Sequence, residues 1–158
     1  MADVIIRPAR EEDRRRLAEL YAEVAAEGDK IGGEAPVDVE RRASTFRLDG
    51  FFVAEAAGEP VGTLSVFEEQ DGVGEIGMML AVGWRGRGLG TRLMQVAIEH
   101  ARARGMHKLS LGVWPHNEPA IALYRKFGFV EEGRRVKHYR RRNGDLWDIV
   151  EMGLLLDE

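Results

Sequence analysis

The segment Trp84-Arg85-Gly86-Arg87-Gly88-Leu89-Gly90-Thr91 combines residue types that together bind anions. Its glycines let the backbone turn tightly enough for successive N–H groups to converge on one point, and its arginines add positive charge. The residues from Leu89 to Arg104 place apolar side chains at helical spacing. Such a helix leaves its first N–H groups unpaired at the positive end of its dipole, beside the loop. The pattern therefore predicts a site for a phosphate or pyrophosphate.

Two well-known nucleotide-binding loops do not fit this segment. A P-loop requires a lysine after its last glycine, whereas Thr91 follows Gly90 here. A Rossmann fingerprint that begins at Gly86 would need its third glycine at position 91. A glycine-rich string before a helix also occurs as an ordinary turn, so the rest of the chain must decide between a turn and a ligand site.

The apolar patterns around this loop predict an α/β protein. We expect strands at residues 4–7, 51–55, 60–67, 75–82, 109–114 and 147–156, a further strand opening at 129–130, and helices at 11–26, 38–48, 89–104 and 119–126. Residues 51–82 are predicted to form an antiparallel meander, and residues 75–114 a parallel strand–helix–strand crossover. The glycine loop then follows the carboxyl end of a strand, where open α/β sheets bind ligands.

The composition limits the classes of protein that this chain represents. Its 158 residues, 44% hydrophobic and 32% charged, predict one globular domain over residues 1–158. The absence of cysteine excludes disulfides, thiolate metal sites and a cysteine nucleophile. A net charge of −4 argues against a nucleic-acid partner. No apolar run is long enough to cross a membrane, and the N-terminus lacks a signal peptide's pattern, so we expect a cytoplasmic protein without a membrane or metal partner.

Two separated motifs resemble those of the GNAT superfamily, the acyl-CoA-dependent N-acetyltransferases. The first is Arg85-x-x-Gly88-x-Gly90, similar to the family's Arg/Gln-x-x-Gly-x-Gly/Ala pattern. The second is the segment 117–129, in which an asparagine precedes an Ala-x-x-Leu-Tyr helix that ends in Gly-Phe. Both occur in the family's order, with a helix and a strand between them. The predicted elements also follow the GNAT order over nearly the whole chain.

The resemblance implies a fold and a cofactor. The fold is a single-domain α/β (α+β) arrangement: a mixed, mostly antiparallel sheet with a central parallel βαβ crossover and helices on both faces. The cofactor is acetyl-CoA, whose pyrophosphate would bind the glycine loop while main-chain groups at the end of the preceding strand meet its pantetheine arm. The implied cofactor-binding residues are Leu80, Ala81, Val82, Arg85, Gly86, Arg87, Gly88, Leu89, Gly90, Thr91 and Asn117.

The resemblance also suggests catalytic residues. Tyr124 stands where the family places its general acid, and a phenol is suited to protonating a departing thiolate. Asn117 and a backbone N–H near Leu80 are candidates for polarising the thioester carbonyl. Glu75 is the best candidate base, and His116 is a second choice. The same position at the start of a strand is also typical of a solvent-exposed glutamate without a catalytic role. Some members carry a glutamate in a Leu-Glu-Val strand, which is Leu111-Gly112-Val113 here, so that base is absent.

The acceptor is less defined. We expect a small primary amine or an amino-acid-like molecule, with contacts from Tyr21, the loop 29–36, His138 and Tyr139. The arginine-rich run 134–142 is either a solvated face or a site for a carboxylate or the CoA 3′-phosphate. A protein N-terminal or lysine acetyltransferase is the first alternative, and a non-catalytic CoA-binding sensor domain is the second. A homodimer is expected because the family often pairs through its late strands.

Overall fold

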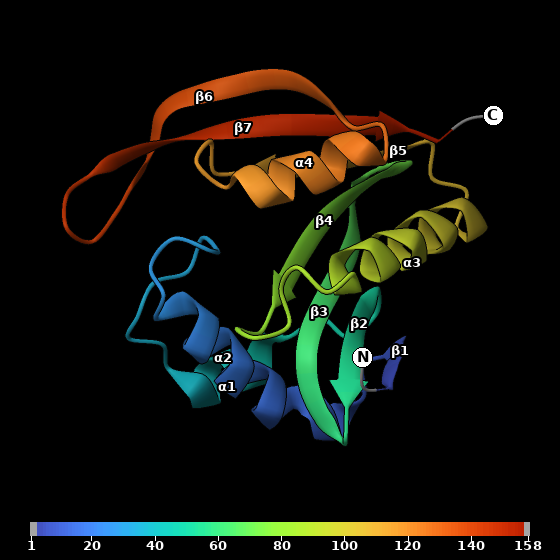
Figure 1. Ribbon diagram of the computed structural model, residues 1–158, viewed down its shortest axis with the longest axis vertical. Helices are drawn as coiled ribbons and strands as arrows, with labels where there is room; N and C mark the ends of the chain where they lie inside the picture. The colour runs from blue at the N-terminus through green and yellow to red at the C-terminus, as the bar shows by residue number, and fades with distance from the viewer. Residues whose placement is uncertain (1–2, 157–158) are drawn as a thin grey trace. The chain divides into compact units, whose positions relative to one another are not determined.

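A computed structural model describes residues 3–156, so the first two and last two positions of the predicted domain lie outside the described residues. Seven strands follow one another in the hydrogen-bonded order β1-β2-β3-β4-β5-β7-β6 (Figure 1). The neighbours β4 and β5 are parallel, whereas β1–β2, β2–β3, β5–β7 and β6–β7 are antiparallel. The predicted α/β class and mixed sheet are thereby confirmed.

The chain divides into two compact units. The first contains the residues up to Phe67 together with Gly77–Ala97, and the second contains Glu68–Ile76 and the chain from Ile98 onward. Three elements run through both: β3 (Glu59–Gln70), β4 (Val73–Leu80) and α3 (Leu89–Ala103). The single domain over residues 1–158 stays a prediction.

In the first unit, two helices pack with the first strands. The elements are β1 (Val4–Pro8), a short 3-10 helix η1 (Glu11–Asp13), α1 (Arg14–Ala25), α2 (Val39–Thr45) and β2 (Phe51–Ala56). Leu17 and Ala18 of α1 pack in one buried cluster with Phe46, Phe51 and Val53. The rings of Phe46 and Phe51 meet edge to face, with centroids 5.2 Å apart. This cluster fixes α1, and therefore the loop that follows it, on the strands.

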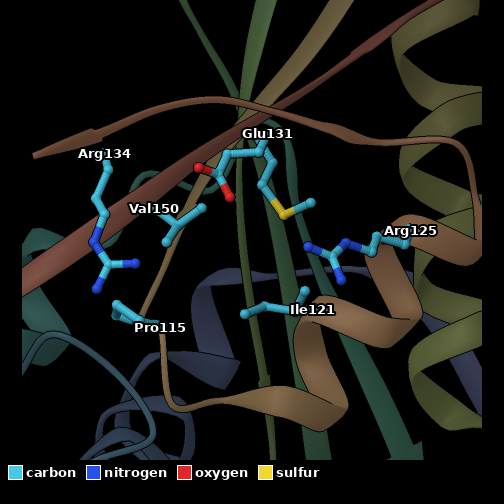
Figure 2. A pocket seen from close by; sticks show the side chains of 7 residues that line it. Pro115, Ile121, Arg125, Glu131, Arg134 and Val150 are labelled. Carbon is cyan, nitrogen blue, oxygen red and sulfur yellow. The ribbon is translucent and has the colours of Figure 1, made fainter.

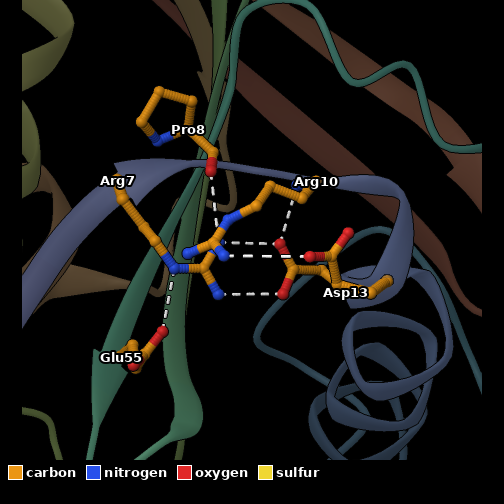
Figure 3. Close-up of polar contacts among 6 residues, drawn as sticks. Arg7, Pro8, Arg10, Asp13 and Glu55 are labelled. Carbon is orange, nitrogen blue, oxygen red and sulfur yellow. Dashed lines mark hydrogen bonds and ion pairs between the residues drawn. The ribbon is translucent and has the colours of Figure 1, made fainter.

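An ion-pair cluster ties β1, β2 and the start of the helical segment together (Figure 3). Arg7 donates two hydrogen bonds of 2.8 Å to the carboxylate of Asp13 and one of 2.8 Å, through Nε, to Glu55. The backbone N–H of Arg10 also donates to Asp13, at 2.7 Å. These bonds hold the pKa of Asp13 below its usual value, mainly because of the Arg7 hydrogen bonds.

The second unit is built on β5 (Lys108–Val113), α4 (Glu118–Lys126), β6 (Val130–Arg140) and β7 (Leu146–Leu155). The parallel register of β4 with β5 covers three pairs, the last of which sets Glu75 opposite Ser110. On its other side β5 pairs with β7 along its whole length. In Figure 1, α4 lies alongside β6 and β7.

Several predicted boundaries differ from the observed ones. The strand expected at 75–82 ends at Leu80, because Ala81 and Val82 already belong to the turn that leads into the glycine loop. The helix expected at 11–26 begins as the separate turn η1, and the helix expected at 38–48 covers only Val39–Thr45. The strand expected at 60–67 continues to Gln70, because it forms a long hairpin arm that apolar periodicity alone does not define.

Candidate functional site

The loop between β4 and α3 has the backbone conformation that its glycines predict. Gly83, Gly86 and Gly88 have φ values of +89°, +71° and +87°, a region that other residues rarely adopt. A Cβ atom built at any of the three would meet nothing within 4 Å. The glycines are therefore required by the turn itself, and the space beside them is open to a ligand.

The amide groups of this loop have no acceptor within the described chain. No hydrogen bond is donated by the backbone N–H of residues 85–91, and the first bond of α3 runs from Arg92 N–H to the carbonyl of Gly88. Several unpaired donors therefore gather at the positive end of the α3 dipole. An anion with several oxygens, such as the pyrophosphate of CoA, fits this arrangement.

The side chain of Arg85 is bound by other residues of the first unit. Its guanidinium binds both carboxylate oxygens of Glu27, at 2.7 and 2.8 Å, and donates to the carbonyl of Leu80 at 2.8 and 3.2 Å. The pair with Glu27 raises the pKa of Arg85 and lowers that of Glu27. Arg85 thus fastens the loop to the end of α1 and to the end of β4, and only its backbone N–H remains for an anion.

The main-chain groups expected to meet pantetheine are not equally available. The carbonyl of Leu80 accepts from Arg85, and the N–H of Ala81 donates to Val61 at 2.9 Å. The carbonyl of Ala81 accepts from Trp84 at 3.1 Å. Neither backbone group of Val82 has a partner in the described part of the chain. Val82 is therefore the strongest of the three candidates for pairing with an amide of the pantetheine arm.

In the second unit, Tyr124 lies on α4 with its ring buried. The residue is 9% exposed, and its ring lies against that of Phe129, with centroids 5.8 Å apart. Burial raises the pKa of Tyr124 to about 12. The hydroxyl donates no hydrogen bond to a described residue, yet it is not among the fully enclosed polar atoms. The hydroxyl is therefore protonated and accessible, as a proton donor must be.

Asn117 is the N-cap of α4. Its side-chain oxygen accepts a hydrogen bond from the N–H of Ala120 at 3.4 Å, which is the ordinary structural role of an asparagine at this position. Its amide NH₂ group has no acceptor within the described chain. The capping bond orients the side chain, and the NH₂ group remains able to donate to a ligand. Asn117 and Tyr124 lie two helical turns apart, which places them on similar faces of α4.

Glu75 occupies the last parallel pair of β4 and β5. The side chain keeps access to solvent, but surrounding atoms remove part of its solvation and raise its pKa. A hydrogen bond with Ser110 opposes this rise, whereas the charges of Glu151 and Glu69 add to it. None of the described contacts joins Glu75 to Tyr124 or Asn117. Glu75 has the elevated pKa of a candidate base, and its role stays a prediction.

An aromatic cluster at the end of β5 was not expected from the sequence. The ring of Trp114 meets those of Trp147 and Tyr139 edge to face, at 5.0 and 5.5 Å between centroids, and Arg141 lies over both tryptophans. His116 packs against Trp147 at 5.1 Å. Tyr139 and Trp147 are cross-strand partners, so the register around the turn at Asn143-Gly144 was the signal that would have revealed part of this cluster. His116 is thus an aromatic packing partner.

A small cavity opens between α4, β6 and β7 (Figure 2). Its volume is about 180 Å³, below the range of about 300 to 1,000 Å³ typical of ligand pockets. The lining residues are Pro115, Ile121, Arg125, Glu131, Arg134, Val150 and Met152. Arg134 donates to Asp148 at 2.8 Å and is therefore already paired. The size of this cavity argues against its being the acceptor site.

Within positions 3–156, no cluster of three or more histidine, aspartate and glutamate side chains is arranged around a common point where a metal ion would bind. The same stretch contains no helix with the length and apolar character of a membrane span.

Comparison with known proteins assigns these features to a family. A model of the acetyltransferase (GNAT) family matches residues 14–129. The chain is 31% identical over 163 residues to the L-methionine sulfoximine/L-methionine sulfone acetyltransferase of Pseudomonas aeruginosa, and the match covers 96% of this chain and 94% of that protein.

Solved structures share the fold. The ribosomal-protein-alanine N-acetyltransferase of Brucella melitensis is 32% identical, with a TM-score of 0.84, over 96% of this chain and 99% of that one. A phosphinothricin acetyltransferase from Sinorhizobium meliloti, solved in complex with acetyl-CoA, is 23% identical, with a TM-score of 0.84, over 98% of this chain and 89% of that one. At 23% identity, the similarity to the Sinorhizobium meliloti structure shows a shared fold alone.

Proposed function

Because the chain belongs to the GNAT family of acetyltransferases, we propose that it transfers the acetyl group of acetyl-CoA directly to the primary amine of a small, amino-acid-like molecule. The observation that carries this proposal is the row of unpaired N–H groups from Arg85 to Thr91 at the start of α3. A pyrophosphate satisfies several such donors at once. The small-molecule acceptor is supported by the relative from Pseudomonas aeruginosa, which is matched over nearly its whole length.

In this proposal, the cofactor is bound mainly through backbone groups. The amides of residues 85–91 bind the pyrophosphate, the backbone of Val82 pairs with the pantetheine arm, and Asn117 contributes its amide NH₂ group. Bound acetyl-CoA supplies an activated acetyl group as a thioester. The guanidinium of Arg85 keeps the loop in place through Glu27 and the carbonyl of Leu80, so that only the backbone N–H of this residue contacts phosphate.

Two side chains handle protons in the proposed reaction. Glu75 accepts the proton that the acceptor ammonium must lose before its nitrogen can attack, either directly or through a water molecule. Tyr124 holds a proton for the sulfur that departs as the new C–N bond forms and the C–S bond breaks. The protons balance: the acceptor ammonium loses one proton before attack and a second as the amide forms, the CoA thiolate takes up one, and the other stays on Glu75 until it passes to solvent.

The pKa of Tyr124 indicates how it acts. A thiol like that of cysteine has a pKa of about 8.5, so a phenol of pKa about 12 is the weaker acid by about 3.5 units, or about 5 kcal/mol for complete proton transfer. We therefore propose that Tyr124 stabilises the developing thiolate chiefly by donating a hydrogen bond. Full transfer becomes favourable only if the bound complex lowers this pKa.

A peptide acceptor is the second candidate, because the Brucella melitensis structure of similar identity is a ribosomal-protein-alanine N-acetyltransferase. A non-catalytic CoA-binding domain is the alternative from a different class. Release of free CoA thiol from acetyl-CoA, measured with a panel of amino acids, simple amines and N-terminal peptides, separates the three. Turnover of amino acids with little turnover of peptides supports our proposal, and acetyl-CoA binding without thiol release on any acceptor would refute both enzymatic functions.

We also propose a homodimer that pairs through β6. This strand ends the sheet order, and its side chains are largely exposed, including Val130 at 60% and Val136 at 68%. An unpaired edge strand with exposed apolar side chains favours pairing with another chain. A molar mass of one chain in light scattering at micromolar concentration would contradict this. The cytoplasmic location and the lack of a nucleic-acid or membrane partner stay predictions.

A further inference from the structure

The guanidinium of Arg42, on α2, lies over an aromatic ring of α1. Its guanidinium carbon is 3.8 Å from the centroid of the Tyr21 ring and 5.0 Å from that of Phe46. The Nε atom is fully buried in this contact and has no hydrogen-bond partner. The contact with two rings and the burial of Nε restrict the positions that the guanidinium can adopt.

The guanidinium of Arg42 donates to no acidic group or carbonyl within the described chain. Several other arginines of the first unit are paired with carboxylates: Arg7 with Asp13 and Glu55, Arg14 with Glu11, Arg16 with Glu19 and Glu59, and Arg85 with Glu27. The carboxylate of Asp38, at the start of the same helix, caps α2 by accepting from the N–H of Arg41. A half-buried, oriented guanidinium without an acceptor is costly unless an anion binds it.

The loop that precedes α2 closes against the other end of Tyr21. A Cβ atom at Gly33 would lie 2.0 Å from the Tyr21 hydroxyl oxygen, so only glycine allows this approach. Tyr21 therefore contacts Arg42 with its face and the backbone of the loop with its hydroxyl end. The two contacts combine a positive charge, a phenol and a loop backbone in one place on the first unit.

We infer that Arg42, held by Tyr21, binds the carboxylate of the acceptor. This inference rests on the proposed function, since it assigns part of the recognition of an amino-acid-like acceptor. A guanidinium binds a carboxylate through two parallel N–H···O bonds, which selects amino acids over simple amines. The arginines of the closing hairpin are weaker candidates, because Arg134 and Arg135 are already paired with Asp148 and Glu151.

The test compares Arg42→Ala with the unmodified protein on two acceptors: the best α-amino acid of the panel and the amine that lacks only its carboxyl group. We expect kcat/KM for the amino acid to fall about tenfold to a hundredfold, as for loss of a charge-assisted pair, and kcat/KM for the amine to change less than about threefold. Arg41→Ala is the matched control, because Arg41 is exposed and its neighbour on the same helix. This variant is expected to leave kcat/KM unchanged for both acceptors.

Other outcomes overturn the inference in distinguishable ways. An equal loss on both acceptors would mean that Arg42 only supports the packing of α1 and α2, which the melting temperature would register. A loss confined to the KM of acetyl-CoA would assign Arg42 to a cofactor phosphate. Unchanged kinetics would remove Arg42 from acceptor binding. If the unmodified protein acetylates no amine at all, the proposed function itself is wrong, which the panel reveals before any variant is made.

Discussion

Replacing Tyr124 by phenylalanine removes one hydroxyl and separates catalysis from packing. The ring is buried against Phe129, and phenylalanine keeps that contact. The hydroxyl has no partner within the described chain, so its removal leaves no unsatisfied group behind. The free energy of unfolding should therefore change by less than about 0.5 kcal/mol, or increase slightly.

The expected effect on the reaction is much larger. Loss of the hydrogen bond to the developing thiolate should lower kcat about tenfold to a hundredfold, with the affinity for acetyl-CoA retained. The measurements are CoA thiol release under saturating substrates, titration calorimetry with acetyl-CoA, and chemical denaturation. A Phe variant with full kcat, or one whose lost activity follows lost stability, would refute the catalytic assignment.

The pH dependence provides an independent check of the same assignment. With a pKa near 12, Tyr124 stays protonated throughout the usual assay range, so kcat should not fall between about pH 8 and 10. A descending alkaline limb in that range that disappears in the Phe variant would show that the pKa in the complex is much lower. In that case full proton transfer, rather than hydrogen-bond donation, would describe its role.

Three further predictions concern the base, the loop and the fold. Glu75→Gln should lower kcat/KM at least tenfold. Because burial raises the pKa of Glu75, its base form is lost as pH falls through a value above 4.5, so the rate of the unmodified protein should decrease at acidic pH. This acidic decrease should be absent from the pH–rate profile of the variant. Gly88→Ala meets no steric clash but places a side chain at φ +87°, a strain of about 1 to 2 kcal/mol, so calorimetry should show acetyl-CoA binding about tenfold weaker. Unchanged binding would contradict a role of the glycine loop in binding the pyrophosphate. Asp13→Asn should lower the free energy of unfolding by about 2 kcal/mol at neutral pH, as measured by denaturant unfolding. Because the folded pKa of Asp13 is lowered, the stability that this carboxylate contributes is present above its unfolded pKa and is lost as pH falls through its folded pKa. The free energies of unfolding of the variant and the unmodified protein should therefore converge in acid.

The glycine loop was predictable from sequence because its conformation is encoded locally. Only glycine occupies positive φ without strain, and the helical pattern from Leu89 defines where unpaired N–H groups begin. Asn117 and Tyr124 were expected from the resemblance to the second GNAT motif, and the structure places Asn117 at the start of α4 and buries Tyr124 on it. These features need no knowledge of distant parts of the chain.

Side-chain contacts between residues far apart in the chain could not be predicted in this way. Glu27 stands 58 positions from Arg85, and nothing in the motif indicates that the arginine side chain turns to α1 rather than to the cofactor. The stacking of Arg42 on Tyr21 likewise joins two helices through a loop whose path depends on Gly33. A side chain's partner is determined by which segments pack together, and sequence spacing does not contain that information.

The sequence by itself determined the family, the mixed sheet and the anion-binding loop, because backbone conformation and apolar periodicity are local properties that short motifs express directly. The tertiary structure alone decided which hydrogen-bonding groups remain available to bind a ligand. It pairs the carbonyl of Leu80 with Arg85, leaves the backbone of Val82 unpaired, and presents Arg42 without an acceptor on the ring of Tyr21. Availability follows from packing, since burial and neighbouring charges set both the hydrogen-bond partners and the pKa of each group.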